Sequence, residues 1–299
     1  MKLYRFKTFR TSYYFPQIEK GNSFLYGVYF PFGWVAKCYW WMFRHCFLLR
    51  KFNEAKNPDL EFPYSRIMKL LPQKCKASFN MGTPGPEQKI SILGIDADGN
   101  RFFAKYSEKP KAMALTRNEW QILNNLKGTG LAPSIFDWKE DDSFCFLQTA
   151  YVEGTTYKQL RLEKDVVDLA IKISQRHLFD NKTAEVKLET SLSHGDFTPW
   201  NMLVKNGEIR LIDWEMADER ELGYDLFTFI TQINMLFSSD KSANDAISEN
   251  KAMLDLYFQS FGINDWRPYL VAFSERRMKY ANDKDDKLLA DRMKQLEFY

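Results

Sequence analysis

The sequence predicts an α+β fold of two lobes, a first lobe with a small antiparallel sheet of five strands and a second lobe that is mainly helical. Three observations support this fold class. Short runs of alternating apolar residues, separated by turn signals, follow one another between residues 77 and 152. After residue 154, apolar residues recur mostly at helical spacing, and one short hairpin interrupts them. Strands followed by helices are typical of α+β folds rather than of alternating βα units.

In the first lobe, strands are expected over residues 77–79, 89–95 and 101–106. The Asp98-Gly99-Asn100 sequence suits a hairpin turn between the second and third of these strands. A helix is expected next, over 112–126, because apolar residues recur there at helical spacing. Two further strands, over 133–138 and 144–152, then complete the sheet.

In the second lobe, helices are expected over residues 164–178, 224–237 and 251–261. A hairpin of strands 202–204 and 209–212 is also expected, because Asn206-Gly207 favours a type I′ turn. These elements predict three parts of the chain. They are an aromatic-rich extension over 1–75, a lobe rich in strands over 76–153, and a mainly helical lobe over 154–299.

Composition and charge exclude several classes of function. The chain of 299 residues is 45% hydrophobic and 16% aromatic, which is enough to bury a sizeable core. A net charge of +3 gives no electrostatic argument for a nucleic-acid partner. Neither the histidines nor the cysteines have zinc-site spacing, and the cysteines indicate a reducing cytoplasm rather than a disulfide framework. The cysteines are Cys38, Cys46, Cys75 and Cys145.

Three polar residues flank the expected Asn-Gly hairpin. Asp196 and Asn201 stand just before it, and Asp213 stands just after it. A tight turn brings the ends of its two strands together, so these side chains can converge at one edge. Phosphoryl transfer requires such a group: a carboxylate to orient the attacking hydroxyl, and oxygen ligands that hold magnesium against the nucleotide.

The segment 194–201, His-Gly-Asp-Phe-Thr-Pro-Trp-Asn, followed by Ile-Asp-Trp-Glu at 212–215, resembles the aminoglycoside phosphotransferase and choline kinase family. That family has a protein-kinase-like fold, and the resemblance implies a kinase that uses ATP and Mg²⁺. It implies that Asp196 is the catalytic base and that His194 braces the loop. Asn201 and Asp213 would be the magnesium ligands.

Asp225, in Gly-Tyr-Asp-Leu at 223–226, matches the acidic residue with which this family supports the catalytic loop from the next helix. The alternative is that Asp225 only stabilises the start of its own helix, where a carboxylate is favourable by itself.

Lys105 lies in the strand expected over 101–106, and alternation along that strand points its side chain inward. A buried ammonium group requires a charged partner. Glu119 on the following helix is the candidate, and the resemblance implies that the pair positions the α- and β-phosphates. The alternative for Glu119 is a capping box, which the sequence Thr-Arg-Asn-Glu at 116–119 also fits.

The segment 80–86, Asn-Met-Gly-Thr-Pro-Gly-Pro, lies between the first two expected strands, where a kinase-like fold covers the phosphates. We expect Gly82, Thr83 and Gly85 to contact the nucleotide. Pro84-Gly85 predicts a type II turn with positive φ at Gly85. The two prolines lack N–H groups, so this loop offers fewer donors than a GxGxxG loop. Adenine is expected against the backbone at Ala150 and Val152, where the lobes connect.

The acceptor is predicted less directly. The segments 82–86 and 194–201 look similar to those of bacterial kinases of cell-envelope sugar or lipopolysaccharide biosynthesis, which favours a sugar or glycolipid acceptor. One alternative is an aminoglycoside or choline-type amino alcohol. Another is a nucleotide-binding regulator without turnover, although the complete set of site residues favours an enzyme. A protein kinase is disfavoured because no long activation segment follows Asp213.

The stretch 34–51 of the extension mixes aromatic residues with lysine and arginine. It is too short and too often interrupted by charge to span a membrane. Two interpretations remain open: a helix docked on the first lobe, or a helix that rests in a lipid interface. The sequence thus predicts a cytoplasmic protein, with peripheral contact at the inner face of the membrane as the second interpretation. It gives no indication of oligomeric state.

Overall fold

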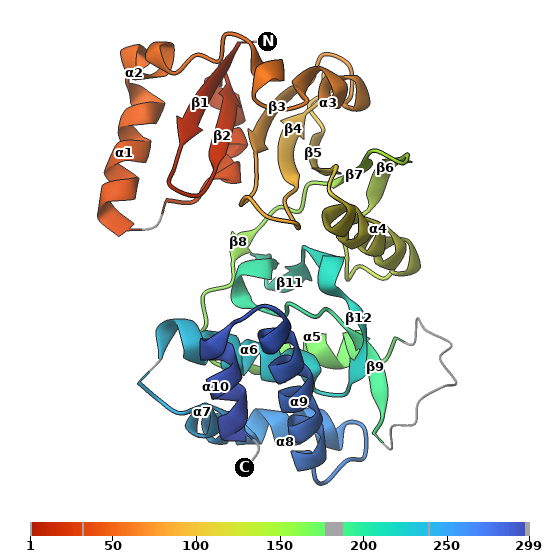
Figure 1. Cartoon of the computed structure of the whole chain (residues 1–299). Helices are drawn as coiled ribbons and strands as arrows, with labels where there is room; N and C mark the ends of the chain where they lie inside the picture. Colours follow the sequence, from red (N-terminus) through yellow and green to blue (C-terminus); the bar gives the residue numbers. More distant parts are fainter. Residues whose placement is uncertain (1, 32, 177–187, 239, 297–299) are drawn as a thin grey trace. The chain divides into compact units, whose positions relative to one another are not determined.

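The computed structural model describes residues 2–31, 33–176, 188–238 and 240–296. The chain divides into two compact units (Figure 1). Unit 1 comprises Met1–Gln121 and Pro133–Tyr151, and unit 2 comprises Ile122–Ala132 and Val152–Tyr299. Unit 1 contains the large sheet and unit 2 contains most of the helices, so the predicted α+β class is confirmed.

Unit 1 contains a seven-stranded antiparallel sheet with the strand order β1-β2-β3-β4-β5-β7-β6. The five strands expected from the sequence all form, as β3 to β7. Two more strands extend the sheet at the β3 edge, so the predicted number of five is wrong. The strands are β1 (Leu3–Lys7), β2 (Ser12–Pro16), β3 (Lys76–Asn80), β4 (Ile90–Ile95), β5 (Arg101–Ser107), β6 (Ile135–Glu140) and β7 (Cys145–Ala150).

The two additional strands come from the N-terminal extension. β1 and β2 form a hairpin, and β2 pairs with β3 at Tyr13↔Asn80 and Tyr14↔Phe79. Without β2, β3 would be an exposed edge with unpaired backbone groups. Backbone pairing of this kind has no sequence motif of its own, and aromatic residues interrupt the alternation in this stretch. The extension is therefore part of the sheet of unit 1.

The helical stretch of the extension is divided into α1 (Gly33–His45) and α2 (Phe47–Phe52). Cys46 between them has extended backbone angles, which ends the single helix that the sequence suggested. Trp40 and Phe43 of α1 are buried against Phe6 of β1, with ring centroids 5.0 and 4.9 Å away. One face of α1 is thus docked on the hairpin. Among the described residues, no helix has both the length and the hydropathy needed to cross a bilayer.

The core of unit 1 is aromatic. Phe79 of β3, Phe102 of β5 and Phe146 of β7 are buried together with Ile67 of α3 (Tyr64–Leu70). Burial of each such side chain contributes roughly 1.5–3 kcal/mol. The 3₁₀ segments η1 (Lys20–Val28) and η2 (Pro58–Leu60) connect the elements of the extension. This core fixes the sheet on which β5 carries Lys105.

Helix α4 (Pro110–Asn125) begins before the expected residue 112. Proline suits the first turn, because the N–H group that it lacks has no partner there. Thr116 consequently lies inside the helix, where its Oγ1 donates to Ala112 O at 2.9 Å. The capping box considered over 116–119 is therefore not formed, since the helix begins six residues before Thr116.

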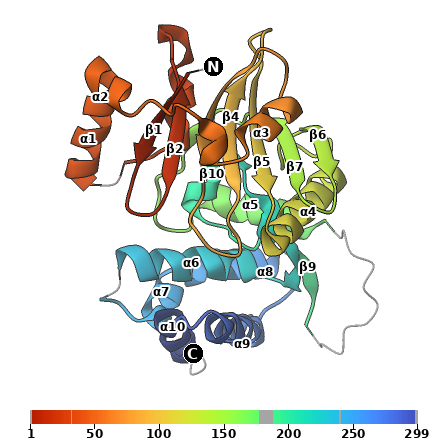
Figure 2. The same ribbon diagram turned by 45° about the horizontal axis from the view of Figure 1, so that its top comes forward.

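Unit 2 is mainly helical, and Figure 2 shows its long helices from a second side. The helix expected over 224–237 has those bounds, and the one expected over 251–261 ends two residues earlier. The helix expected over 164–178 ends at Ser174, and residues 177 and 178 lie outside the described part. The sequence did not predict α7, α9 or α10. The helices are α5 (Lys164–Ser174), α6 (Tyr224–Phe237), α7 (Ala243–Glu249), α8 (Lys251–Gln259), α9 (Arg267–Asp283) and α10 (Lys287–Leu296).

The expected hairpin forms from β10 (Met202–Lys205) and β11 (Glu208–Leu211). Asn206 and Gly207 have φ of 54° and 80°, the positive values that a type I′ turn requires. The hairpin is not isolated, however. β8 (Thr155–Thr156) pairs with β10, and β9 (Thr190–Ser193) pairs with β12 (Asp218–Glu221). These small sheets hold both ends of the segment that links β9 to β10.

Candidate active site

The segment between β9 and β10, residues 194–201, is the loop in which the sequence predicted the catalytic residues. His194 is fully buried, and its ring spans the loop. Its Nε2 lies 3.0 Å from Ile212 O, and its Nδ1 accepts a hydrogen bond from the Asp196 N–H at 3.3 Å. A carbonyl oxygen can only accept, so Nε2 carries the ring proton. Burial lowers the pKa of His194, so the ring acts as a neutral brace between the loop and the end of β11.

Gly195 is required by its surroundings. Its φ is 82°, in the left-handed region, and a Cβ atom at this position would overlap Met216 O and the guanidinium of Arg220. The loop therefore turns closely over the segment before β12. This close approach fixes the direction in which the next residue, Asp196, leaves the turn.

Asp225, in the first turn of α6, supports the same loop. Its carboxylate accepts hydrogen bonds from the His194 N–H at 2.8 Å, the Gly195 N–H at 3.0 Å and the Ser193 hydroxyl at 2.7 Å. The carboxylate is buried, and hydrogen bonds to a charged acceptor are stronger than neutral ones. All three donors belong to the end of β9 and the loop. Asp225 thus contributes more than a favourable charge at the start of its own helix.

Asp196 and Asn201 are joined directly. The Asn201 amide nitrogen donates to Asp196 Oδ2 at 2.8 Å and to Asp196 O at 2.9 Å. Burial raises the pKa of Asp196 above its usual range, and repulsion from the nearby Asp213 carboxylate adds to this effect. The Asn201 hydrogen bond and the positive charge of Arg277 act in the opposite direction. The carboxylate is thus oriented by Asn201 in a partly dry environment.

Asp213 follows β11 and has φ 67° and ψ 58°. A residue other than glycine in this left-handed region stores about 1–2 kcal/mol of strain, and such strain is typical of functional sites. The neighbouring Ile212 N–H donates to Asn201 O at 3.0 Å, which ties the end of β11 to the loop. Unit 2 therefore brings together Asp196, Asn201 and Asp213, as the hairpin predicted.

These side chains suit a divalent metal ion. A carboxylate oxygen of Asp213 lies within 4.8 Å of one from Glu215, which the sequence did not single out as a ligand. The Asn201 nitrogen is used by Asp196, which leaves the amide oxygen as the acceptor. Carboxylate and amide oxygens are the ligands that Mg²⁺ prefers, and a cation would relieve the repulsion between Asp196 and Asp213.

In unit 1, Lys105 and Glu119 form the expected ion pair. Lys105 Nζ lies 2.5 Å from Glu119 Oε2, and each side chain is only 5% exposed. Lys105 is on β5, and Glu119 is on α4, inside the helix rather than at its start. Moving either side chain away would leave a buried charge unpaired, which strongly destabilises a protein. The two groups therefore hold each other in place.

The loop between β3 and β4 contains the expected phosphate-contacting residues Gly82, Thr83 and Gly85. Gly82 has φ 66°, and a Cβ atom there would overlap Lys89 O. Gly85 has the expected positive φ, but its value of 156° is far from the +80° of a type II turn. The turn instead lies over Gly85–Gln88, where the Gln88 N–H donates to Gly85 O at 3.3 Å. The predicted turn is therefore displaced by two residues, because Pro86, like Pro84, suits the second position of a turn.

The backbone near residue 150 was expected to contact adenine. The Ala150 N–H donates to Ser134 O at 2.8 Å, and the Tyr151 N–H donates to Arg101 O at 3.4 Å. These amides are used within unit 1. An adenine contact at this place would have to use the Ala150 carbonyl group or the backbone of Val152.

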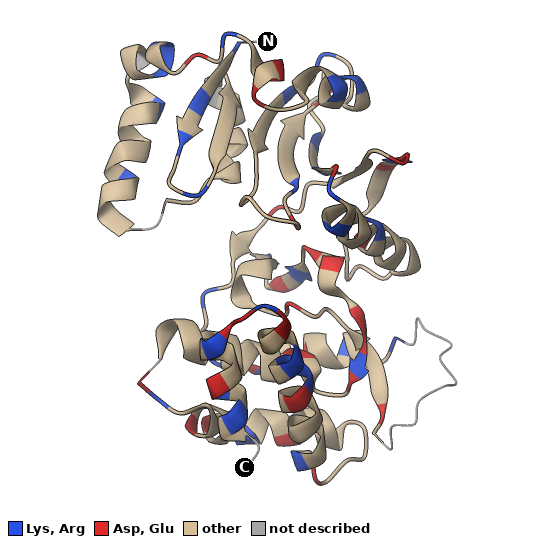
Figure 3. Ribbon diagram, in the orientation of Figure 1, with Lys and Arg blue, Asp and Glu red and all other residues tan. Residues whose placement is uncertain are grey.

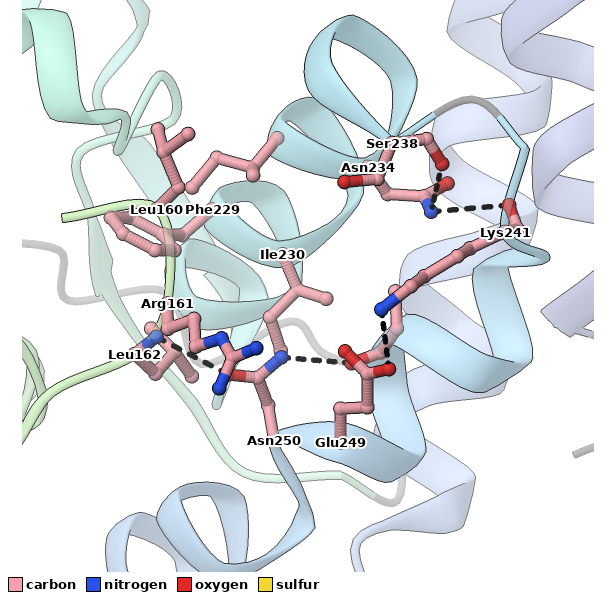
Figure 4. A pocket seen from close by; sticks show the side chains of 12 residues that line it. Leu160, Arg161, Leu162, Phe229, Ile230, Asn234, Ser238, Lys241, Glu249 and Asn250 are labelled. Atoms are coloured by element: carbon pink, nitrogen blue, oxygen red, sulfur yellow. Dashed lines mark hydrogen bonds and ion pairs between the residues drawn. The ribbon is translucent and has the colours of Figure 1, made fainter.

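A pocket of about 140 Å³ lies elsewhere in unit 2, between residues 160–162, α6 and the α7–α8 junction (Figure 4). Asn234 of α6 donates to Ser238 O at 3.1 Å and to Lys241 O at 3.2 Å. Lys241 also pairs with Glu249 at 2.6 Å. Asn234 lies nine residues after Asp225 on α6, roughly 13 Å along the helix. The pocket is therefore distinct from the loop that contains Asp196.

The structure adds functional candidates that the sequence did not indicate. Arg220 on β12, whose guanidinium lies close to Gly195, and Arg277 on α9, whose charge acts on the Asp196 carboxylate, are both buried. Neither belongs to a motif, and α9 itself was not predicted. Ser193 contributes one of the donors to Asp225. Only the tertiary structure brings these side chains near Asp196.

The segment that contains the loop 194–201 is similar to a known protein family. Residues 157–269, which include the whole catalytic loop, match the family model described as the phosphotransferase enzyme family, APH. The predicted resemblance to the aminoglycoside phosphotransferase and choline kinase family is thereby confirmed for this segment. The resemblance to cell-envelope sugar kinases stays a prediction.

Solved structures share the fold at low sequence identity. The amicoumacin kinase hAmiN, in a complex with AMP-PNP, Ca²⁺ and Ami, is 10% identical, with a TM-score of 0.55 over 80% of this chain and 95% of its own. An ethanolamine kinase from Plasmodium vivax is 11% identical, with a TM-score of 0.55 over 81% of this chain and 88% of its own. An aminoglycoside-3′-phosphotransferase of type VIII is 14% identical, with a TM-score of 0.50 over 79% and 97%. No curated protein sequence matches the chain significantly.

Proposed function

We propose that the protein transfers the γ-phosphate of ATP to a hydroxyl group of a small molecule. The observation that supports this most strongly is the grouping of Asp196, Asn201 and Asp213, held by His194 and Asp225. The hydroxyl oxygen of the acceptor forms a bond to the γ-phosphorus, while the bond from that phosphorus to the bridging oxygen breaks and ADP leaves. The hydroxyl proton passes to the Asp196 carboxylate.

Asn201 and Asp213 would hold Mg²⁺, through the amide oxygen and the carboxylate. When bound, the ion supplies positive charge between the phosphate oxygens and so favours departure of ADP. Lys105, oriented by Glu119, would bind the α- and β-phosphates, and Gly82, Thr83 and Gly85 would cover them. The AMP-PNP and Ca²⁺ in the amicoumacin kinase complex support a nucleotide and a divalent cation as the required ligands.

The test measures nucleotide binding and phosphoryl transfer separately. Calorimetry with Mg²⁺ and the non-hydrolysable AMP-PNP should show binding, and ATP consumption should rise when the correct acceptor is supplied. The control for the variant Asp196→Asn is Asp218→Asn, because Asp218 is an exposed residue of β12. Nucleotide binding without transfer to any acceptor would favour the alternative, a regulator without turnover.

We further propose that the acceptor is a sugar or a glycolipid of the cell envelope. The named neighbours act on other small molecules, an aminoglycoside, ethanolamine and amicoumacin, so amino-alcohol acceptors are the alternative. The observation that favours a lipid-linked acceptor is the outer face of α1 and α2. There Trp34, Trp41 and Phe52 are 76%, 62% and 87% exposed.

This face has the composition of an interfacial surface. Figure 3 shows that α1 and α2 contain Lys and Arg but no acidic residue. Exposed aromatic rings beside cations favour the interface of a membrane with anionic lipids. We therefore propose a cytoplasmic protein that contacts the inner face of the membrane through residues 34–51.

Flotation with vesicles tests this contact. The protein should float with vesicles of phosphatidylglycerol and phosphatidylcholine, and float less with phosphatidylcholine alone. Trp34→Ser with Trp41→Ser should abolish flotation. Phe136→Ser, at an exposed position of β6, is the control. Equal flotation of the double variant and the wild type would remove α1 from this role.

A further inference from the structure

Two adjacent arginines of α9 have opposite environments. Arg276 forms a bidentate pair with Glu221 of β12, through Nε at 3.0 Å and a terminal nitrogen at 2.6 Å. Arg277 is more deeply buried, only 8% exposed, and has no hydrogen bond or ion pair within the described part of the chain. Its Nε is inaccessible to solvent and unpartnered, and the ring of Tyr280, 5.4 Å away, is its aromatic neighbour.

Such an arrangement is unfavourable for a protein without a ligand. A buried charge is costly unless it is paired and hydrogen-bonded, and a guanidinium group has five donors to satisfy. Arg276, the preceding residue, has a complete carboxylate partner in Glu221 of β12. No described residue gives Arg277 such a partner, so an anionic ligand would complete its hydrogen bonds.

The position of Arg277 indicates what this partner is. α9 packs against α6, which contains Asp225, and against β12. β12 in turn pairs with β9, the strand that leads into the loop 194–201. The positive charge of Arg277 acts on the Asp196 carboxylate, the proposed base, without bonding to it. A group bound by Arg277 would thus lie within electrostatic reach of the Asp196 carboxylate.

Arg220 is a different case, although it is also buried near the loop. Its guanidinium donates to Met216 O at 2.7 Å and lies over the ring of Tyr224 at 4.3 Å, although its second terminal nitrogen is buried without a partner. It therefore supports the segment on which Gly195 rests. Arg277 also contacts a ring, that of Tyr280, but its Nε has no hydrogen-bond partner among the described residues.

We propose that Arg277 is the anion-binding residue of the acceptor subsite, and that the natural acceptor carries a phosphate or carboxylate group near the hydroxyl that receives the γ-phosphate. The proposal rests on the proposed function, because it concerns the acceptor of the same site. The planar fork of a guanidinium matches either anion with two parallel hydrogen bonds. The anion would also separate Arg277 from Asp196 and leave the base free to accept the proton.

Anion binding tests this without turnover. Inorganic phosphate is titrated into the protein saturated with Mg²⁺ and ADP, which occupy the nucleotide site. Arg277→Gln should weaken phosphate binding about tenfold or more, since a charged hydrogen-bonding partner is lost. Arg276→Gln is the matched control and should leave phosphate binding unchanged. Equal phosphate binding by the wild type and Arg277→Gln would overturn the proposal.

The melting temperature distinguishes a ligand-binding role of Arg277 from a structural role. Arg276→Gln leaves Glu221 buried and unpaired, so its melting temperature should fall. Arg277→Gln removes an unpartnered buried charge, so its melting temperature should stay unchanged or rise. A fall in Arg277→Gln as large as that in Arg276→Gln would mean that Arg277 has a structural partner, and would count against the proposal.

Matched acceptors then distinguish the two anions. ATP consumption is compared with glucose, glucose 6-phosphate and glucuronate. One anionic sugar should exceed glucose in kcat/KM by about tenfold or more, and Arg277→Gln should remove this preference while Arg277→Lys keeps part of it. A preference for glucose, or one that persists in Arg277→Gln, would overturn the proposal.

Failure of AMP-PNP to bind would instead contradict the proposed function. In that event phosphate titration of a Lys105→Gln variant, whose nucleotide site is disabled, still tests Arg277.

Discussion

The two loops predicted to meet the nucleotide and the acceptor are built differently. The loop 194–201 is buried, and it is fixed by His194 and by the carboxylate of Asp225. The loop between β3 and β4 is only partly buried. Its shape depends on the positive φ of Gly82 and Gly85 and on side-chain hydrogen bonds, such as those from Gln88 to Met81 O at 3.0 Å and from Lys109 to Gly85 O at 2.7 Å. The comparison indicates that the loop proposed to hold the proton acceptor is fixed rigidly, and that the loop proposed to cover the nucleotide is held less firmly.

The largest expected effect is that of Asp196→Asn. Turnover should fall by roughly 10²–10⁴, the usual contribution of a general base, because the amide cannot accept the hydroxyl proton. The Asn201 hydrogen bond to the side-chain oxygen can be kept, so the loop should stay folded. Steady-state kinetics with calorimetry of AMP-PNP binding measures both effects. Near-normal turnover would remove Asp196 from its role.

Lys105→Met should have the next largest effect, on both the stability of the protein and its affinity for the nucleotide. It leaves Glu119 buried without its partner, which costs about 3–5 kcal/mol in the free energy of unfolding. The double variant Lys105→Met, Glu119→Leu should recover much of this stability, but it should not recover nucleotide affinity. Urea unfolding and AMP-PNP titration of the three proteins measure the two effects. If the double variant bound the nucleotide normally, the pair would be structural only.

Asp213→Ala tests the metal ligand. The variant should need a higher magnesium concentration for nucleotide binding, because one of the oxygen ligands is lost. The change also leaves alanine in a left-handed conformation, so Asp213→Asn, which tolerates that conformation, is the matched variant. A magnesium titration of AMP-PNP binding provides the measurement. Magnesium dependence identical to that of the wild type in both variants would contradict the assignment.

The smallest expected effects are those of alanine substitutions at two glycines, whose losses of stability are compared. A Cβ atom at Gly195 or at Gly82 would overlap a backbone oxygen, Met216 O or Lys89 O respectively. Gly195→Ala should lower the free energy of unfolding by about 2 kcal/mol or more, because the rigid loop cannot shift. Gly82→Ala should cost less stability, since this loop is only partly buried and can move, and should mainly raise KM for ATP. Equal losses of stability would show that the two loops are equally rigid.

Local sequence signals predicted a large part of the fold. The Asn206-Gly207 turn, the strands β3 to β7 and the helix α6 follow from patterns within a few residues. The attachment of β1 and β2 to the sheet could not be predicted, because pairing with β3 depends on backbone groups that every residue has. Among the helices, α9 was not predicted, since its polar and apolar residues lack clear periodicity.

The candidate site divides in the same way. The sequence by itself determined the hairpin and the residues beside it, Asp196, Asn201 and Asp213, because a tight turn fixes neighbours that are close along the chain. It also determined that Lys105 points inward, through the alternation of its strand. Only the tertiary structure decided that Glu119 meets Lys105 rather than capping its helix, and that Asp225 holds the loop. It alone placed Arg277 near Asp196, because contacts between residues far apart in sequence depend on how helices and strands pack.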